Sequence, residues 1–349
     1  MTTVTTPDVR LAALREWIAA ARPGEPFTLA PASADASFRR YFRVSFAERT
    51  LIAMDAPPPH ENCRPFVDVA RLLRGAGVNA PEVFAEDLER GFLLLSDLGA
   101  RTYLSALDAA SAPALYRDAL ATLVRMQTDA TPGRLPAYDR AIQQRELDLF
   151  RDWYVARHAG LEWTDAHRVQ WNEGCAALLA NTLQQPRVFV HRDYHSRNLM
   201  VCDGAANPGV LDFQDALQGP ITYDLVSLLK DAYIRWDEAF VLDQVARYWD
   251  AARRAKLPVD ADFAAFYRDF EWMGVQRQLK VLGIFARLYH RDGKAAYLDD
   301  MPRVAAGLVA ACQRYAALRP ILALLEGVGL TNASGAPDAA SAAAVGYTF

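Results

Sequence analysis

Two short apolar segments of this chain run directly into polar side chains, and they constrain the fold more than any other feature. The first segment, residues 188–190, is followed by the polar octapeptide from His191 to Asn198. The second, residues 209–211, ends at Asp212. Apolar runs of this length bounded by turn residues are typical of buried strands. We therefore expect two strands whose ends deliver these polar side chains to one site.

The residue types at this spacing fit phosphoryl transfer. That reaction needs a carboxylate to accept the proton of the attacking hydroxyl, and an amide oxygen and a second carboxylate to hold Mg²⁺ against the nucleotide phosphates. Asp193 matches the first role, and Asn198 and Asp212 match the other two. A chance tripeptide with a loop asparagine is the plain alternative. The five-residue spacing and the second Asp-Phe are joint requirements of the motif, so the sequence predicts a kinase-like enzyme that uses ATP and Mg²⁺.

The segment after Asp212 narrows the class of kinase. A protein kinase would continue with Asp-Phe-Gly and a long activation segment that ends in Ala-Pro-Glu. Here Gln214 leads through Gly219-Pro220 into an apolar helix from Tyr223, which leaves no room for such a segment. These elements resemble the aminoglycoside phosphotransferase and choline kinase superfamily of small-molecule kinases. The resemblance makes His191 and Asp224 structural supports of the catalytic loop.

The fold class that follows is α+β, a two-lobed protein-kinase-like fold with a small antiparallel-sheet N-lobe and a mostly helical C-lobe. A chain of 349 residues that is 52% hydrophobic can bury a core of that size. We place the N-lobe at residues 1–96, the C-lobe at 97–326 and a flexible tail at 327–349. Periodicity predicts N-lobe helices at 11–21 and 64–75, and strands at 27–30, 38–44, 51–54, 83–86 and 91–95.

The nucleotide-binding residues are implied by the resemblance. The loop at 34–37 occupies the place of the phosphate-covering loop, although it lacks glycines. The tetrapeptide from Ser96 to Gly99 resembles the hinge whose backbone binds adenine; it also reads as a simple hairpin turn. The third strand offers Met54 where the family usually has a basic residue. Either Arg39, Arg40 or Arg43 of the preceding strand supplies that charge, or phosphate binding is weaker than in relatives. The predicted set is Ser37, Phe38, Arg39, Arg40, Arg43, Leu95, Ser96 and Asp97.

The substrate is expected on the helical lobe, along a helix at about 263–290. Its apolar positions form one stripe, and three basic residues fall on the opposite face, given ~100° per residue. A solvated basic face is one interpretation. A cationic pocket wall for an acidic substrate is the other. The predicted substrate residues are Arg277, Lys280 and Arg287, together with His195 of the catalytic loop.

Three segments, 34–44, 54–58 and 191–200, are similar to one subgroup, the anomeric kinases of N-acetylmuramate and N-acetylglucosamine in cell-wall recycling. The resemblance implies ATP-dependent phosphorylation of the anomeric hydroxyl. That hydroxyl is more acidic than an ordinary alcohol, so Asp193 need only be a weak base. An aminoglycoside kinase with an acidic pocket and a choline-like kinase with an aromatic cage stay open. Met54 also leaves open an inactive kinase-fold binding protein.

Composition excludes several partners. The net charge is -4 with no block of Lys or Arg, which argues against nucleic acid and anionic membranes. The four cysteines lack metal-ligand spacing. Residues 1–10 lack the apolar core of a signal peptide, and no apolar run approaches ~18 residues, so a cytoplasmic enzyme is expected, with no protein partner evident. Sugar preference, ATP versus GTP and oligomeric state are not determined by the sequence.

Overall fold

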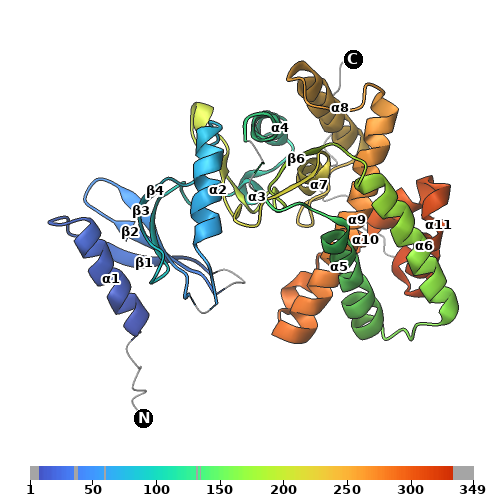
Figure 1. Ribbon diagram of the computed structural model, residues 1–349, viewed down its shortest axis with the longest axis horizontal. Coiled ribbons are helices and arrows are strands. Elements are labelled where there is room, and N and C mark those ends of the chain that lie inside the picture. The colour runs from blue at the N-terminus through green and yellow to red at the C-terminus, as the bar shows by residue number, and fades with distance from the viewer. Residues whose placement is uncertain (1–7, 35–37, 59, 131–132, 134, 333–349) are drawn as a thin grey trace, which may run out of the picture.

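The N-terminal part of the computed structural model is a five-stranded antiparallel sheet in the order β1-β2-β3-β5-β4 (Figure 1). The structure describes residues 8–34, 38–58, 60–130, 133 and 135–332, so the predicted Ser37 lies outside it. The strands are Thr28–Ala34 (β1), Arg40–Ser45 (β2), Thr50–Asp55 (β3), Val83–Asp87 (β4) and Phe92–Ser96 (β5). This confirms the small antiparallel sheet expected of the N-lobe.

The two faces of this sheet are covered by different helices, as Figure 1 shows. Helix α1 (Val9–Ala21) packs Leu14 and Ile18 against Phe42 and Ala53 on one face. Helix α2 (Arg64–Gly75) packs on the other face, where Met54 joins the core that continues into the C-lobe. Because side chains alternate along a strand, each residue of β2 is assigned to one of these two faces.

The C-terminal part is mostly helical, with four short strands that frame the catalytic loop. Strand β6 pairs with β9, and β7 pairs with β8. The strands are Arg187–Val190 (β6), Leu199–Met200 (β7), Gly209–Val210 (β8) and Leu217–Pro220 (β9). The helices are Tyr103–Ala106 (α3), Ala112–Asp129 (α4), Arg140–Leu149 (α5), the π-helical Phe150–His158 (η1), Asp165–Thr182 (α6), Tyr223–Leu229 (α7), Glu238–Arg254 (α8), Phe263–Asp292 (α9), Met301–Arg314 (α10) and Arg319–Gly327 (α11).

Helix α9 is the central element of the C-lobe. Its first half contributes Phe270 and Met273 to a core shared with both lobes, and its second half contributes Leu279 and Leu282 to a separate core with α6, α10 and α11. Gly283 is required at a close approach, because a Cβ there would lie 2.4 Å from a backbone carbon of Leu149. Helix α9 therefore touches the chain where α5 continues into η1.

The shared core joins the two lobes directly. The ring centroids of Phe66, in α2, and Phe213, which directly follows Asp212, are 4.8 Å apart. Leu93 and Leu95 of β5 belong to the same cluster as Phe189 of β6. The N-lobe is thus packed onto the strands that carry the catalytic loop.

Several elements differ from the sequence-based expectation. Strand β1 runs four residues further than predicted, to Ala34, and β2 begins at Arg40 and not at residue 38. Strand β9 precedes α7 and was not predicted, because Gly219-Pro220 reads locally as a turn. At the other end of the chain, Leu330 is buried in the core with α10 and α11, so the packed chain continues past residue 326. Residues 333–349 of the predicted tail lie outside the described residues.

Of the two interpretations of the basic residues of α9, the solvated face is wrong for Arg277 and Lys280. These side chains are only 7% and 6% exposed, because most of α9 between Phe270 and Ala286 is buried. Arg287 is partly exposed. Within the part of the chain that the structure describes, no helix is both long and apolar enough to cross a membrane.

Candidate active site

The catalytic loop begins where β6 ends, and a buried carboxylate holds its first two residues. Asp224 of α7 accepts hydrogen bonds from the backbone N–H groups of His191 (2.6 Å) and Arg192 (3.0 Å). Arg192 has φ +80°, a left-handed conformation that costs a non-glycine residue about 1–3 kcal/mol. Burial raises the pKa of Asp224 to about 7, against the effect of the two N–H donors. This arrangement is the supporting role expected for Asp224 and His191.

The three predicted catalytic side chains lie together. Asn198 Nδ2 donates to the backbone carbonyl of Asp193 (3.0 Å) and to Asp212 Oδ2 (3.2 Å). Asp212 also has a left-handed backbone, φ +64°, and its Oδ1 accepts from Gln214 Nε2 at 2.8 Å. Strain of this kind concentrates at functional sites, where the surrounding structure maintains it. The strand-loop-strand unit therefore brings the predicted trio to one point.

Asp193 is held ionised by the cations behind it. Desolvation would raise the pKa of its carboxylate, but Lys280 and Arg277 outweigh that effect and lower the pKa to about 2. Arg277 Nη1 lies 3.9 Å from Asp193 Oδ1 and donates to the carbonyl of Arg192 at 3.0 Å. A carboxylate in this state is a weak base, which suits an acidic hydroxyl.

Behind the loop lies a buried charge cluster that the sequence did not reveal. Glu146 of α5 accepts from Arg192 Nη2 (2.5 Å) and lies 3.1 Å from Lys280 Nζ. Lys280 also donates to the hydroxyl of Tyr223 at 2.9 Å, and Tyr138 donates its hydroxyl to Glu146. Burial would raise the pKa of Glu146, but Lys280 and Arg192 lower it below its ordinary value. The cluster fixes Arg192, the residue with the strained backbone.

On the N-lobe side, one of the three candidate arginines faces the catalytic residues. Arg39 Nη2 lies 3.9 Å from Asp212 Oδ1, and its Nε lies 3.8 Å from Glu61 Oε2. Glu61 also accepts from the backbone N–H of Phe38 at 3.3 Å. The Phe38 ring is 64% exposed and stacks on His60, with centroids 4.5 Å apart. Arg39 thus lies near Asp212, and the phosphate contacts of Arg39 and Phe38 stay a prediction.

The other two arginines are engaged elsewhere. Arg40 lies on the α1 side of the sheet, where it pairs with the buried Asp55 and with Asp8. The structure does not bring it to the catalytic loop, because consecutive residues of a strand point to opposite faces. Arg43 Nε donates to Asp97 Oδ2 at 2.6 Å, so it braces the predicted hinge.

The hinge expectation also becomes more specific. Leu95 pairs with Ile52 of β3 and Val83 of β4. The N–H of Ser96 donates to the carbonyl of Glu82 at 2.9 Å. These sheet interactions leave the backbone from Asp97 onward as the place where a nucleotide base could be bound.

A second carboxylate supports the far end of the catalytic loop. Asp231 Oδ2 accepts from the N–H of Ser196 (2.9 Å) and from its hydroxyl (2.5 Å), and Oδ1 accepts from the N–H of Tyr233 (3.0 Å). The Tyr233 ring meets the His195 ring edge to face, at 5.5 Å between centroids. Arg197 lies over the other part of this ring, with Cζ 3.5 Å from the centroid. His195 and Arg197, which flank Ser196, therefore both contact the ring of Tyr233.

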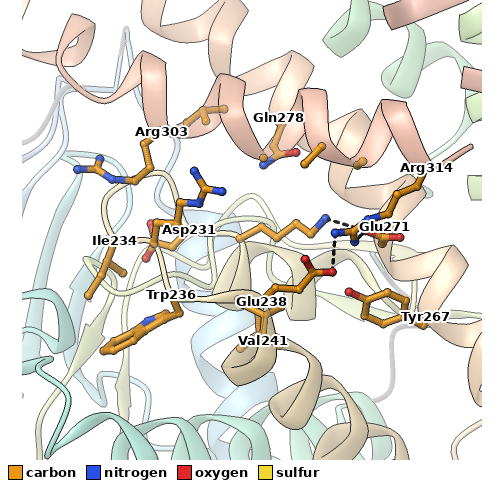
Figure 2. A pocket seen from close by; sticks show the side chains of 17 residues that line it. Asp231, Ile234, Trp236, Glu238, Val241, Tyr267, Glu271, Gln278, Arg303 and Arg314 are labelled. Carbon is orange, nitrogen blue, oxygen red and sulfur yellow. Dashed lines mark hydrogen bonds and ion pairs between the residues drawn. The ribbon is translucent and has the colours of Figure 1, made fainter. Parts of the chain in front are cut away.

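A small polar cavity lies between α8, α9 and α10, as Figure 2 shows. Its volume is about 110 Å³, and Asp231 contributes to its wall. Arg314 pairs with Glu238 (2.5 Å) and Glu271 (2.6 Å) there. These charges are paired with one another, and none of the predicted catalytic residues lines the cavity.

The donor set at Asn198 and Asp212 fits Mg²⁺. The Nδ2 end of Asn198 is occupied by two acceptors, so the Oδ1 end of the amide is the one that can meet a cation. Among the described residues there is no group of three or more His, Cys, Asp or Glu side chains placed to hold a metal. Mg²⁺ does not need one, because it is commonly bound by one or two carboxylates together with the substrate phosphates.

Comparison with known proteins defines the class. The sequence profile of the phosphotransferase enzyme family matches residues 28–257, which include the sheet, the hinge and the whole catalytic unit. The chain belongs to this family of kinase-like enzymes. The family and the two-lobed fold predicted from the motifs are confirmed.

Curated relatives are more specific. The chain is 52% identical over 306 residues to an N-acetylmuramate/N-acetylglucosamine kinase of Pseudomonas aeruginosa, covering 85% of this chain and 90% of the relative. It is 49% identical over 317 residues to a kinase of the same description from Neisseria meningitidis, covering 89% and 94%.

Solved structures agree on the fold. A choline kinase from Streptococcus pneumoniae superposes with a TM-score of 0.62 at 13% identity, covering 86% of this chain and 99% of that one. The ADP-bound aminoglycoside phosphotransferase APH(2'')-Ib superposes with a TM-score of 0.56 at 14% identity, covering 84% and 96%. At this identity the likeness shows the architecture alone.

Proposed function

We propose that this chain is an ATP-dependent kinase that phosphorylates the anomeric hydroxyl of N-acetylmuramate and N-acetylglucosamine. The observation that carries the proposal is the positive surroundings of Asp193, where Arg277 and Lys280 lower the pKa of the catalytic carboxylate. The curated relatives at about half identity support the same two sugars. The role in peptidoglycan recycling and a cytoplasmic location, where ATP is available, belong to the same proposal.

In this proposal Asp193 orients the anomeric hydroxyl and accepts its proton. Asn198 and Asp212 hold Mg²⁺, which when bound would neutralise charge on the phosphate oxygens. Arg39 supplies the positive charge that Met54 does not, because it is the arginine of the β2 region that lies near Asp212. Arg277 keeps Asp193 ionised and fixes the neighbouring carbonyl of Arg192.

The acidity of the acceptor explains why so weak a base is sufficient. An anomeric hydroxyl loses its proton more readily than an ordinary alcohol, so proton transfer to a carboxylate with a low pKa is less unfavourable.

The charge of the site also argues against the alternative acceptors. A polycationic aminoglycoside or a quaternary amine bound with its hydroxyl at Asp193 would lie close to the positive charge of Arg277, whose Nη1 is 3.9 Å from Asp193 Oδ1. Repulsion between like charges makes that arrangement unfavourable. An inactive binding protein is disfavoured because Asp193, Asn198 and Asp212 are all present and in contact range.

The test is release of ADP with a panel of acceptors: N-acetylmuramate, N-acetylglucosamine, an aminoglycoside and choline. We expect turnover with the two amino sugars only. The methyl glycoside of N-acetylglucosamine, whose anomeric oxygen is blocked, is the matched control and should be inert. Phosphorus NMR of the product then locates the phosphate. Turnover of the aminoglycoside or choline without the sugars, or of the methyl glycoside, contradicts the proposal.

A further inference from the structure

The two sugars of the proposed function differ by one charge. N-acetylmuramate carries a lactyl ether on the ring, which ends in a carboxylate, and N-acetylglucosamine does not. A side chain that recognises this carboxylate must be positively charged and accessible. It must also lie within about the width of one sugar ring of Asp193, where the anomeric oxygen is placed.

The basic residues of α9 do not meet these conditions. Lys280 is 6% exposed and already bound to Glu146 and Tyr223. Arg277 is 7% exposed and donates to a backbone carbonyl. Arg287 is ten residues further along the helix, which is about 15 Å of rise from Arg277. None of the three is an accessible cation beside Asp193.

Arg197 meets the conditions of charge and accessibility, and its place in the catalytic loop supports the third. It is exposed, and it lies in the same loop as Asp193, four residues further on. No carboxylate of the described residues lies within ion-pair distance of its guanidinium. The guanidinium instead lies against the ring of Tyr233, with Cζ 3.5 Å from the centroid. An arginine that is stacked on an aromatic ring keeps its N–H edge available for a carboxylate.

The support under Arg197 is rigid. Asp231 is 7% exposed and binds both the Ser196 hydroxyl and backbone, next to Arg197, and the N–H of Tyr233, which carries the ring. One carboxylate thus fixes the cation's own loop and its aromatic platform. Because the Arg197 side chain is oriented before the ligand binds, less conformational entropy is lost on binding.

We propose that Arg197 binds the lactyl carboxylate of N-acetylmuramate and thereby sets the preference between the two sugars. The proposal rests on the proposed function. Its geometry is a planar guanidinium with one face on Tyr233 and two N–H groups directed at the two carboxylate oxygens, the strong paired form of a charge-assisted hydrogen bond. Tyr233 is a positioning residue for this contact.

The experiment measures kcat/KM for both sugars in Arg197→Gln and Arg197→Lys. We expect the ratio for N-acetylmuramate over N-acetylglucosamine to fall about 10- to 100-fold in Arg197→Gln. Arg197→Lys should fall between this variant and the wild type, because it keeps the charge and loses the planar pair. Tyr233→Leu should lower the same ratio, whereas Tyr233→Phe, which keeps the ring, should preserve it.

A substrate analogue without the carboxylate charge provides the matching control. The methyl ester of N-acetylmuramate lacks the charge, so the wild type and Arg197→Gln should use it equally. An unchanged sugar ratio in Arg197→Gln, or an equal loss on ester and acid, overturns the proposal. If the wild type turns over neither sugar, the proposed function fails. Calorimetric binding of N-acetylmuramate to both proteins then still decides the Arg197 contact, and equal affinities reject it.

Discussion

The two sides of the catalytic loop are built differently. Toward the N-lobe, charges are partly exposed and lie nearly 4 Å apart, as Arg39 does from both Asp212 and Glu61. Behind the loop, Glu146, Arg192 and Lys280 are mostly buried, and each of the two cations lies within about 3 Å of the Glu146 carboxylate. The wider spacing on the N-lobe side leaves room for a ligand to bind between the charged groups. Behind the loop, the charged groups already contact one another before any ligand binds.

This difference separates two tasks. The buried side maintains a strained backbone at Arg192, and it must do so whether or not substrate is present. In the proposed function, the open side faces the nucleotide. Substitutions on the buried side should therefore alter folding stability, and those on the open side should alter substrate constants.

Asp193 lies on the border between the two sides and should give the largest effect. We expect Asp193→Asn to lower kcat about 100- to 10,000-fold while nucleotide affinity stays close to that of the wild type, since the variant removes a proton acceptor. Because the pKa of Asp193 is lowered to about 2, its carboxylate stays ionised throughout the ordinary assay range. The acid side of the wild-type pH profile should therefore not report this group. Turnover equal to the wild type would remove Asp193 from the mechanism.

Glu146→Gln tests the buried side. Removing one member of a buried ion cluster leaves Lys280 and Arg192 without their counter-charge, which typically costs about 3–5 kcal/mol. We expect the free energy of unfolding in urea to fall by that amount. Glu86→Gln is the matched control, because Glu86 pairs with Arg71 on the surface at 2.9 Å and such pairs contribute about 0–1 kcal/mol. Similar losses in both variants would mean that burial does not distinguish the two regions.

Arg39→Ala tests the open side, with its neighbours on β2 as controls. We expect the KM for ATP to rise about tenfold or more in Arg39→Ala, with little change in unfolding free energy. Arg40→Ala should show the reverse, because Arg40 pairs with the buried Asp55 on the far face of the sheet. Should Arg39→Ala leave KM for ATP unchanged, the phosphates are bound without an arginine of this region.

The sequence predicted that Asp193, Asn198 and Asp212 share one site, because the motif places them on one contiguous strand-loop-strand unit. Spacing along the chain then translates directly into spacing in the site. The same reasoning found Asp224, since the start of α7 is part of the motif. Local patterns were also sufficient for α2, whose bounds agree with the prediction.

Residues whose partners are distant in sequence could not be predicted. Glu146 lies 46 residues before Arg192, and no local signal links α5 to the catalytic loop. Asp231 is separated from Ser196 by 35 residues in the same way. Arg40 was assigned to the nucleotide because the sequence does not state which face of the sheet α1 covers. Periodicity left both interpretations of the basic residues of α9 open for a related reason, since it does not show that Arg277 and Lys280 are buried.

One hydrophobic core runs from α2 and β5 into the strands of the catalytic loop. This shared core limits how chimeras of two related enzymes can be built. A crossover between two relatives at the hinge would exchange one lobe for a homologous one. It would also divide a single packed cluster, because Phe66 and Phe213 would then come from different parents. Protein interiors tolerate little change in volume. Chimeras of this family should therefore be viable only when α2, β5 and the catalytic strands are inherited together.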